Sequence, residues 1–195
     1  MPRGHAGQIG YTRGAGGTLL LWLLAVAEAA PLTFTQTDSS VAFHASASLH
    51  EFDGKARTFR GVLDPATLQG EIVVEAPSLT TFLGPRDARL SAWCLETEKY
   101  PTIRFVLSGV TGELAGIKAG SGGGAVTLTG TLTIRDVSQV VKVPATYTWE
   151  GQKLRLKGRY DLRWADFGIP DPSIAISTLY PDMYVHFDVL GHPES

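Results

Sequence analysis

The sequence predicts an all-β fold, a closed barrel of eight antiparallel strands with an apolar interior. Apolar and polar side chains alternate in eight separate segments, and successive side chains of a strand point to opposite faces of its sheet. Each segment therefore has one apolar and one polar face. Because the chain has too little helical sequence to cover eight apolar faces, closure of the sheet on itself is the simplest way to bury them.

The alternation places the eight strands in order along the chain. They are expected at residues 41–49, 55–64, 68–76, 102–108, 125–134, 142–149, 153–164 and 183–191. An eight-stranded barrel is filled by its own side chains or holds one small ligand. The inward register contains the candidate lumen residues Phe43, Ile72, Val74, Phe105, Leu128, Gly130, Leu132, Tyr147, Leu156, Gly158 and Phe187.

Two points of this interpretation stay open at the level of the sequence. A β-sandwich of two packed sheets satisfies the same alternation. Gly130 and Gly158, on the inward register, either leave room in the lumen or mark bends where the sheet coils.

Residues 1–29 are expected to be a secretory signal peptide, followed by a single domain over 30–195. Arg3 and Arg13 precede a nine-residue apolar stretch, Leu19–Ala27, and Ala27-Glu28-Ala29 forms an A-x-A cleavage signal. Cleavage after Ala29 is preferred over cleavage after Ala27, and an uncleaved anchor is the alternative. We therefore expect a periplasmic or secreted protein.

The charge of residues 30–195 argues against nucleic acid as a partner. Without Arg3, Arg13 and Glu28, totals of 17 basic and 19 acidic side chains become 15 and 18. A basic row with the spacing of one strand face is typical of a solvated surface and only secondarily of a phosphate site. That row consists of Lys153, Arg155, Lys157, Arg159 and Arg163. The single cysteine, Cys94, is expected to be packed as a small apolar side chain.

Three connections are longer or richer in glycine than an ordinary hairpin. The segment 77–101 contains prolines at Pro85 and Pro101 and predicts one or two short helical turns over a barrel end. The proline-rich segment 165–181 is long enough to fold over a barrel mouth. The segment 116–124 predicts a flexible hairpin tip.

Catalytic and metal-binding signatures are absent from the sequence. It contains no G-x-S-x-G, H-E-x-x-H or C-x-x-C motif. The alternation places His44, His50 and His186 on the outward register, which does not favour a shared metal. We therefore expect neither a metal nor a cofactor, and no enzymatic activity.

Five segments, in this order and spacing, resemble the YceI-like family of polyisoprenoid-binding proteins over roughly residues 33–190. They are His50–Gly54, Pro85–Leu90, Tyr100–Phe105, Gly130–Val137 and Asp166–Ile169. The resemblance implies a lipocalin-like barrel whose lumen holds a polyisoprenoid, an isoprenoid quinone or a similar lipid outside the cytoplasm.

The family motifs also imply which residues stand at the mouth of the barrel. They place Arg86, Asp87, Asp166 and Phe167 at loop junctions, where they are candidates for head-group contacts, although an Arg–Asp pair that only pins a loop is an equal alternative. An enzyme that uses the same lumen and a solidly packed interaction barrel are the competing functions. A homodimer and transient contact with a membrane surface stay open.

Overall fold

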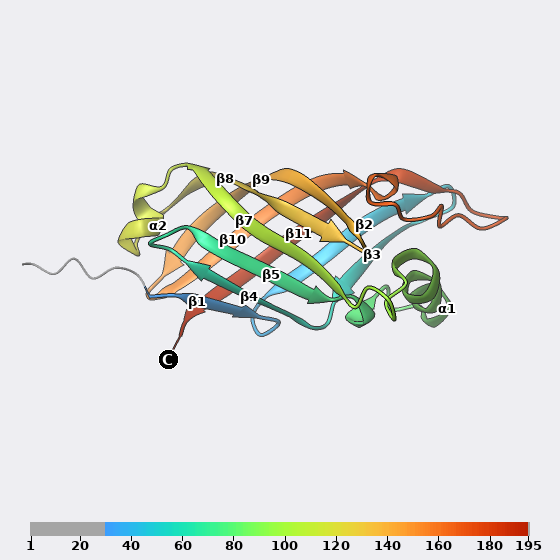
Figure 1. The fold of residues 1–195 in the computed structure, drawn as a ribbon, viewed down its shortest axis with the longest axis horizontal. Helices are drawn as coiled ribbons and strands as arrows, with labels where there is room; N and C mark the ends of the chain where they lie inside the picture. Colours follow the sequence, from blue (N-terminus) through green and yellow to red (C-terminus); the bar gives the residue numbers. More distant parts are fainter. Residues whose placement is uncertain (1–29, 195) are drawn as a thin grey trace, which may run out of the picture.

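The computed structural model describes residues 30–194, so the expected signal peptide lies outside the described residues. These residues form one antiparallel sheet that closes on itself into a long barrel (Figure 1). Closure comes from pairing of the first and last strands, in which Leu32 lies opposite Pro193 and Phe34 opposite Gly191. The barrel, rather than the sandwich, is therefore the architecture.

The eight expected strand positions are occupied by strands, but the range 55–64 is divided between β3 and β4, and β1 and β6 lie outside the expected ranges. The strands are β1 (Leu32–Thr35), β2 (Ser40–Ala47), β3 (Glu51–Ala56), β4 (Phe59–Asp64), β5 (Gln69–Glu75), β6 (Leu79–Thr80), β7 (Thr102–Gly112), β8 (Gly123–Ile134), β9 (Val137–Glu150), β10 (Lys153–Arg163) and β11 (Leu179–Pro193). β1 continues into β2 along β11, β3 continues into β4, and β5 is followed by β6 after one 3₁₀ turn, η1 (Ala76–Ser78).

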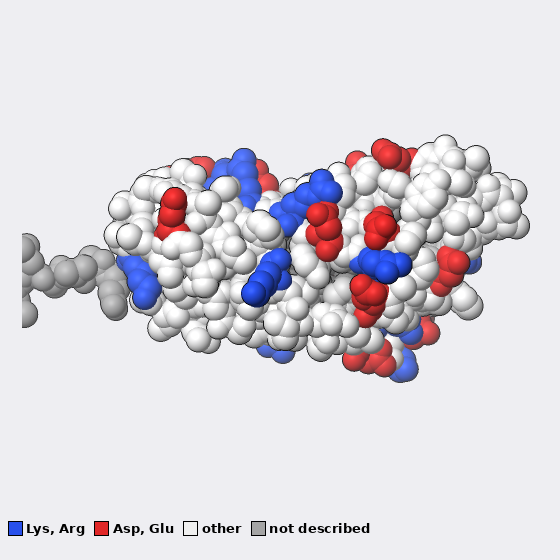
Figure 2. Space-filling model, turned by 90° about the horizontal axis from the view of Figure 1, so that it is seen from above, with Lys and Arg blue, Asp and Glu red and all other residues white. Residues whose placement is uncertain are grey.

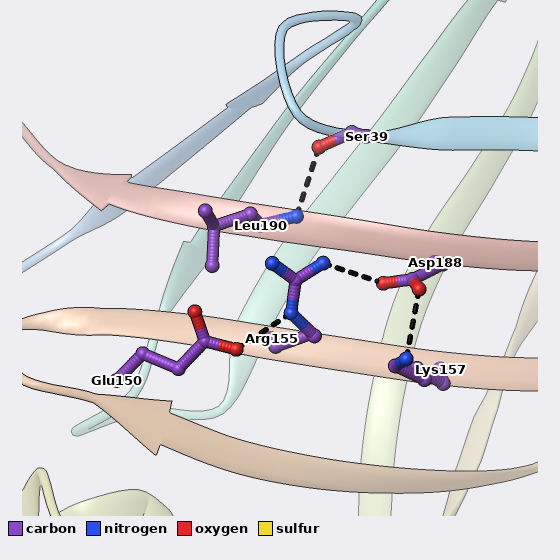
Figure 3. Close-up of polar contacts among 6 residues, drawn as sticks. All are labelled: Ser39, Glu150, Arg155, Lys157, Asp188 and Leu190. Atoms are coloured by element: carbon purple, nitrogen blue, oxygen red, sulfur yellow. Dashed lines mark hydrogen bonds and ion pairs between the residues drawn. The ribbon is translucent and has the colours of Figure 1, made fainter.

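A serine bridges the break between β1 and β2. The Ser39 hydroxyl accepts a hydrogen bond of 2.8 Å from the backbone N–H of Leu190 on β11 (Figure 3). A side chain thus replaces the missing strand acceptor, which a buried N–H needs. The sequence could not show this break, because Leu32 and Phe34 of β1 lie outside the segments in which apolar and polar side chains were seen to alternate.

The short helices lie at the two ends of the barrel. α1 (Gly84–Arg89) and the π-turn η2 (Leu90–Leu95) lie at one end, as expected for the segment 77–101, together with the connection that includes η3 (Trp164–Phe167). The other end carries α2 (Ala115–Ala119). The segment 116–124 connects the antiparallel strands β7 and β8, as expected of a hairpin tip, but it also contains most of α2. Ile117 is buried, and Gly120 ends the helix in the left-handed conformation that glycine adopts easily.

The inward register is as the alternation predicted. Val126, Val143, Leu154 and Leu156 are buried on the inner wall, whereas Lys157 is exposed on the outer wall. Thr127, Thr129 and Arg155 are outward but only half-exposed, since neighbouring strands shield one another. No helix among residues 30–194 is long and apolar enough to cross a membrane.

Candidate functional site

The barrel encloses a cavity of about 640 Å³ whose wall is apolar. Its size lies within the range of small-molecule sites, and such sites combine apolar walls with few polar groups. Eight of the eleven expected lumen residues line it: Phe43, Ile72, Val74, Phe105, Leu128, Leu132, Leu156 and Phe187. The lumen is therefore hollow rather than solidly packed.

The α2 end of the barrel is closed. Ile117 of α2 is buried there with Leu32 and Leu154, and the Tyr147 hydroxyl donates to the Glu113 carbonyl oxygen at 2.8 Å. Tyr147 is only 2% exposed. It belongs to the packed floor of the barrel and not to the cavity wall, so its assignment to the lumen surface was wrong.

Gly130 and Gly158 also do not line the cavity, because phenylalanine rings cover them. A Cβ on Gly158 would lie 2.5 Å from the Phe187 ring, and one on Gly130 would lie 2.5 Å from the Phe105 ring. Phe187 is directly opposite Gly158 across β10 and β11. These glycines provide room for the rings of their neighbours, a third role that neither sequence interpretation contained.

The α1 end is the mouth of the cavity, and Arg86 lies there. Its Nε donates to the Thr81 hydroxyl at 2.8 Å, and its Nη2 donates to the Thr81 carbonyl oxygen at 2.9 Å. The guanidinium lies 3.9 Å from the centroid of the Phe52 ring. Its Nη1 also lies 3.3 Å from Nε2 of His50, so four contacts fix the group, and Arg86 also lines the cavity.

Asp87 has a structural role at this end. Its carboxylate accepts hydrogen bonds from the Thr80 hydroxyl at 2.7 Å and from the Thr81 backbone N–H at 2.6 Å. Desolvation raises the pKa of Asp87, but the hydrogen bonds from Thr81 and Thr80 outweigh it and hold that pKa below its ordinary value. Asp87 thus pins the start of α1 to β6, and it is absent from the cavity wall.

Asp166 and Phe167 do not belong to the mouth, contrary to expectation. Phe167 is 1% exposed in the small core beneath η3. Asp166 lies with Arg159, Arg163 and Asp182 along an open groove on the outer wall. The η3 turn directs the Phe167 ring inward and the adjacent Asp166 outward, so the motif serves packing here.

Two mouth residues were missed by the sequence interpretation. Arg89, one helical turn after Arg86, lines the cavity and donates from Nε and Nη2 to the carbonyl oxygens of Pro172 and Ser173. His50, expected within an outward-facing strand, lies in the turn between β2 and β3 and also lines the mouth. The i, i+3 spacing of Arg86 and Arg89 could have indicated that they share a face.

Titratable groups deeper in the lumen are few. Cys94 is 5% exposed, and desolvation raises its pKa more than Arg89 and Arg135 lower it. Desolvation likewise raises the pKa of Tyr160. Both side chains are therefore protonated at neutral pH. No cluster of three metal-ligating side chains occurs among the described residues.

The basic row on β10 is neutralised by carboxylates. Arg155 pairs with Glu150 at 2.6 Å and with Asp188 at 2.9 Å, and Lys157 pairs with Asp188 at 2.9 Å (Figure 3). Basic and acidic groups are interspersed on the face shown in Figure 2. The row therefore lies on the solvated outer wall and is paired with carboxylates. A solvated surface was the interpretation that its spacing along one strand face favoured.

Comparison with solved structures finds the same fold in bacterial proteins. Burkholderia cenocepacia BcnA is 19% identical, with a TM-score of 0.65 over 78% of this chain and 95% of that chain. A polyisoprenoid binding domain from Saccharophagus degradans is 14% identical, with a TM-score of 0.70 over 83% of this chain and 98% of that chain. The Campylobacter jejuni YCEI protein is 21% identical, with a TM-score of 0.58 over 72% of this chain and 85% of that chain.

No curated protein sequence matches the chain. The family model described as the YceI-like domain matches residues 32–189, which includes β1 and most of β11. This range contains the cavity wall, the closed floor and the mouth. The chain belongs to the YceI-like domain family.

Proposed function

We propose that the protein binds and carries a long apolar amphiphile, such as a polyisoprenoid, an isoprenoid quinone or a similar lipid, in the barrel lumen and without catalysis. The observation that carries this proposal is a hollow apolar lumen of about 640 Å³, closed at the α2 end and bordered at the α1 end by Arg86 and Arg89. The similarity of the fold to that of a polyisoprenoid binding domain from Saccharophagus degradans supports it.

The shape of the lumen suits a chain with a polar end. The apolar tail would lie along Leu128, Leu132 and Leu156, and the head would remain beside the two arginines at the mouth. Burial of one five-carbon unit contributes about 4 kcal/mol before the cost of ordering the chain is subtracted. Several such units are enough for stable binding without a covalent bond.

Carriage is favoured over catalysis by the chemistry of the lumen. A general base or a nucleophile needs a pKa near the working pH. Cys94 and Tyr160 instead have raised pKa values and remain protonated. Glu71 touches the cavity but is engaged by the Arg104 guanidinium, with Nε of Arg104 at 2.9 Å.

A lumen-filling variant tests the proposal. Leu132→Trp places a larger ring in the cavity, whereas Thr131→Trp on the same strand places it on the outer wall and serves as the control. We expect Leu132→Trp to weaken binding of a fluorescent polyene about 10-fold or more while the circular dichroism spectrum stays native. We expect mass spectrometry of an extract of the purified protein to find a lipid. Equal polyene affinity in both variants would place the ligand elsewhere.

A further inference from the structure

The mouth of the barrel is surrounded by exposed apolar side chains. Ten large apolar side chains are exposed in the described part of the chain, and four of them, Val62, Val106, Val140 and Tyr180, belong to strands. The other six lie in the connections at the α1 end. We call these six residues the apolar rim: Leu49, Phe82, Leu83, Trp93, Ile174 and Ile176.

Hydrogen bonds join the three connections that carry the apolar rim. Arg89 of α1 donates to the carbonyl oxygens of Pro172 at 3.2 Å and Ser173 at 3.1 Å. The Ser48 N–H donates to the Thr178 carbonyl oxygen at 2.9 Å, and the Thr178 N–H donates to the Ser48 hydroxyl at 3.1 Å. The rim residues therefore belong to one connected end of the molecule (Figure 1).

The apolar rim is continuous with the lumen. Leu83 and Ile174 line the cavity and are about half exposed, at 51% and 50%. Ile176 and Phe82 extend further into solvent, at 76% and 73%. Single exposed apolar residues are ordinary on a protein surface, whereas a connected group around a cavity marks a site of interaction.

The charges at the mouth favour lipid head groups. Six arginines, Arg60, Arg104, Arg135, Arg155, Arg159 and Arg163, have ion-pair partners. Arg86 and Arg89, like Arg57, form no salt bridge with a carboxylate of residues 30–194. Arg86 contacts Thr81 and His50, and Arg89 donates to the carbonyl oxygens of Pro172 and Ser173. Each retains N–H groups that can bind phosphate.

Two charged carboxylates, Asp87 and Asp171, lie close enough to Arg86 and Arg89 to interact with them, but neither forms a salt bridge with them and both are held by hydrogen bonds of their own. Asp87 accepts from Thr80 and Thr81, and Asp171 accepts from the Ser173 N–H at 2.9 Å. The tip of the molecule at the right-hand end of Figure 2 shows only uncharged residues. An apolar end with a tryptophan and two cations beside it matches the interface of a bilayer, where aromatic and basic side chains are enriched.

We propose that the apolar rim docks the barrel mouth-first on the surface of a bilayer that contains anionic phospholipids. Phe82, Trp93 and Ile176 enter the head-group region, and Arg86 and Arg89 contact phosphates. Resting on the lipid-binding function proposed above, this orientation lets an amphiphile pass between the bilayer and the lumen without exposure of its tail to water.

Vesicle flotation tests the docking surface. Residues 30–195 are used, because they contain the whole closed sheet and exclude the apolar stretch at residues 19–27. We expect the protein to bind vesicles of phosphatidylcholine and phosphatidylglycerol, and to bind vesicles of phosphatidylcholine alone more weakly. Binding to the anionic vesicles should decrease as the salt concentration rises. Phe82→Asp combined with Ile176→Asp should lower partition about 10-fold or more.

Val106→Asp combined with Val140→Asp is the matched control, because both residues are exposed on strands of the outer wall, at 38% and 75%, and the pair adds the same charge as the double rim variant. It should float like the unaltered protein. Full vesicle binding by the double rim variant, or none by the unaltered protein, would overturn the docking proposal. So would a dimer in solution that only the rim variant dissociates, because a second copy would then be the occupant.

Polyene binding in the same variants separates the two proposals. The double rim variant should keep the polyene affinity of the unaltered protein, since neither substitution lies in the interior of the lumen. If no variant binds polyene while flotation still depends on the rim, the docking surface stands and the lipid-carrying function fails.

Discussion

Gly158 and Phe187 illustrate how single residues set the free volume of the lumen. Four phenylalanine rings rest on glycines of a neighbouring strand, namely Phe34 on Gly191, Phe43 on Gly54, Phe105 on Gly130 and Phe187 on Gly158. A ring that lies over a glycine packs against the backbone of the barrel wall. The rings therefore contribute apolar surface without filling the centre of the cavity.

The first prediction concerns Gly158→Ala. The new Cβ would lie 2.5 Å from the Phe187 ring and 2.8 Å from the Pro144 carbonyl oxygen, so ring and backbone must shift. We expect the free energy of unfolding to fall by about 1–3 kcal/mol, as measured by urea denaturation. Gly109→Ala is the control, because its Cβ would meet no atom within 4 Å, and it should change stability by less than about 0.5 kcal/mol. An equal loss in both variants would refute the packing explanation.

At the scale of elements, α1 depends on its contacts rather than on its own helical stability. A helix of six residues is far too short to be stable alone in water. Asp87 ties α1 to β6, Arg86 ties it to Thr81, and Arg89 ties it to the connection before β11. The geometry of the mouth therefore depends on a few polar contacts.

The second prediction is a loss of order at the mouth in acid. Because the folded protein holds the pKa of Asp87 below its ordinary value of 3.8, ionised Asp87 stabilises the fold fully above pH 3.8. This contribution is lost as the pH falls through the lowered pKa. We expect amides of residues 80–90 to exchange hydrogen faster below about pH 4, after correction for intrinsic rates.

Asp87→Asn provides the control for this pH dependence. Asp64, Glu150, Asp171 and Asp188 also have lowered pKa values, so global stability falls in acid for several reasons. In Asp87→Asn, hydrogen exchange of the amides of residues 80–90 should no longer show the additional acceleration in acid. The amides of the β4–β5 turn around Asp64 should keep their acceleration in acid. Unchanged pH dependence at α1 in the variant would exclude Asp87 as the cause.

At the scale of the whole molecule, the two ends of the barrel differ. β1 begins and β11 ends at the closed end, which carries α2 (Figure 1). The open end carries α1, η2 and the connection before β11. Any ligand of the lumen therefore exchanges at the end remote from both termini of the described chain.

The third prediction is export with removal of the first 29 residues. Ala30 and Pro31 are exposed and precede β1, so an enzyme that cleaves after Ala29 would not disrupt the sheet. We expect N-terminal sequencing of the protein recovered from outside the cytoplasm to begin near Ala30. Detection of Met1 or Pro2 at the N-terminus of the soluble protein would contradict the prediction.

The sequence alone predicted an all-β fold, its eight strand positions and the inner face of each strand, whereas the pairing of β1 with β11 decided for the barrel over the sandwich. This was achievable because the two-residue period is a local property, and the inward positions of Leu128, Leu132 and Leu156 follow from their neighbours along one strand. Burial of the apolar face then fixes the register, since a slip of one residue would expose it. The helical turns after Pro85 likewise follow from local signals.

Only the tertiary structure decided the floor, the mouth and the free volume of the lumen. Tyr147 closes one end because its hydroxyl binds the segment before α2. Asp166 and Phe167 lie away from the mouth because η3 turns them to other surroundings. At the mouth, His50 meets Arg86 from a connection that is distant in the sequence. Gly158 receives a ring from a strand that is adjacent in space but distant in sequence. These features depend on contacts between segments far apart in the chain, and the alternation of a single strand contains no information about them.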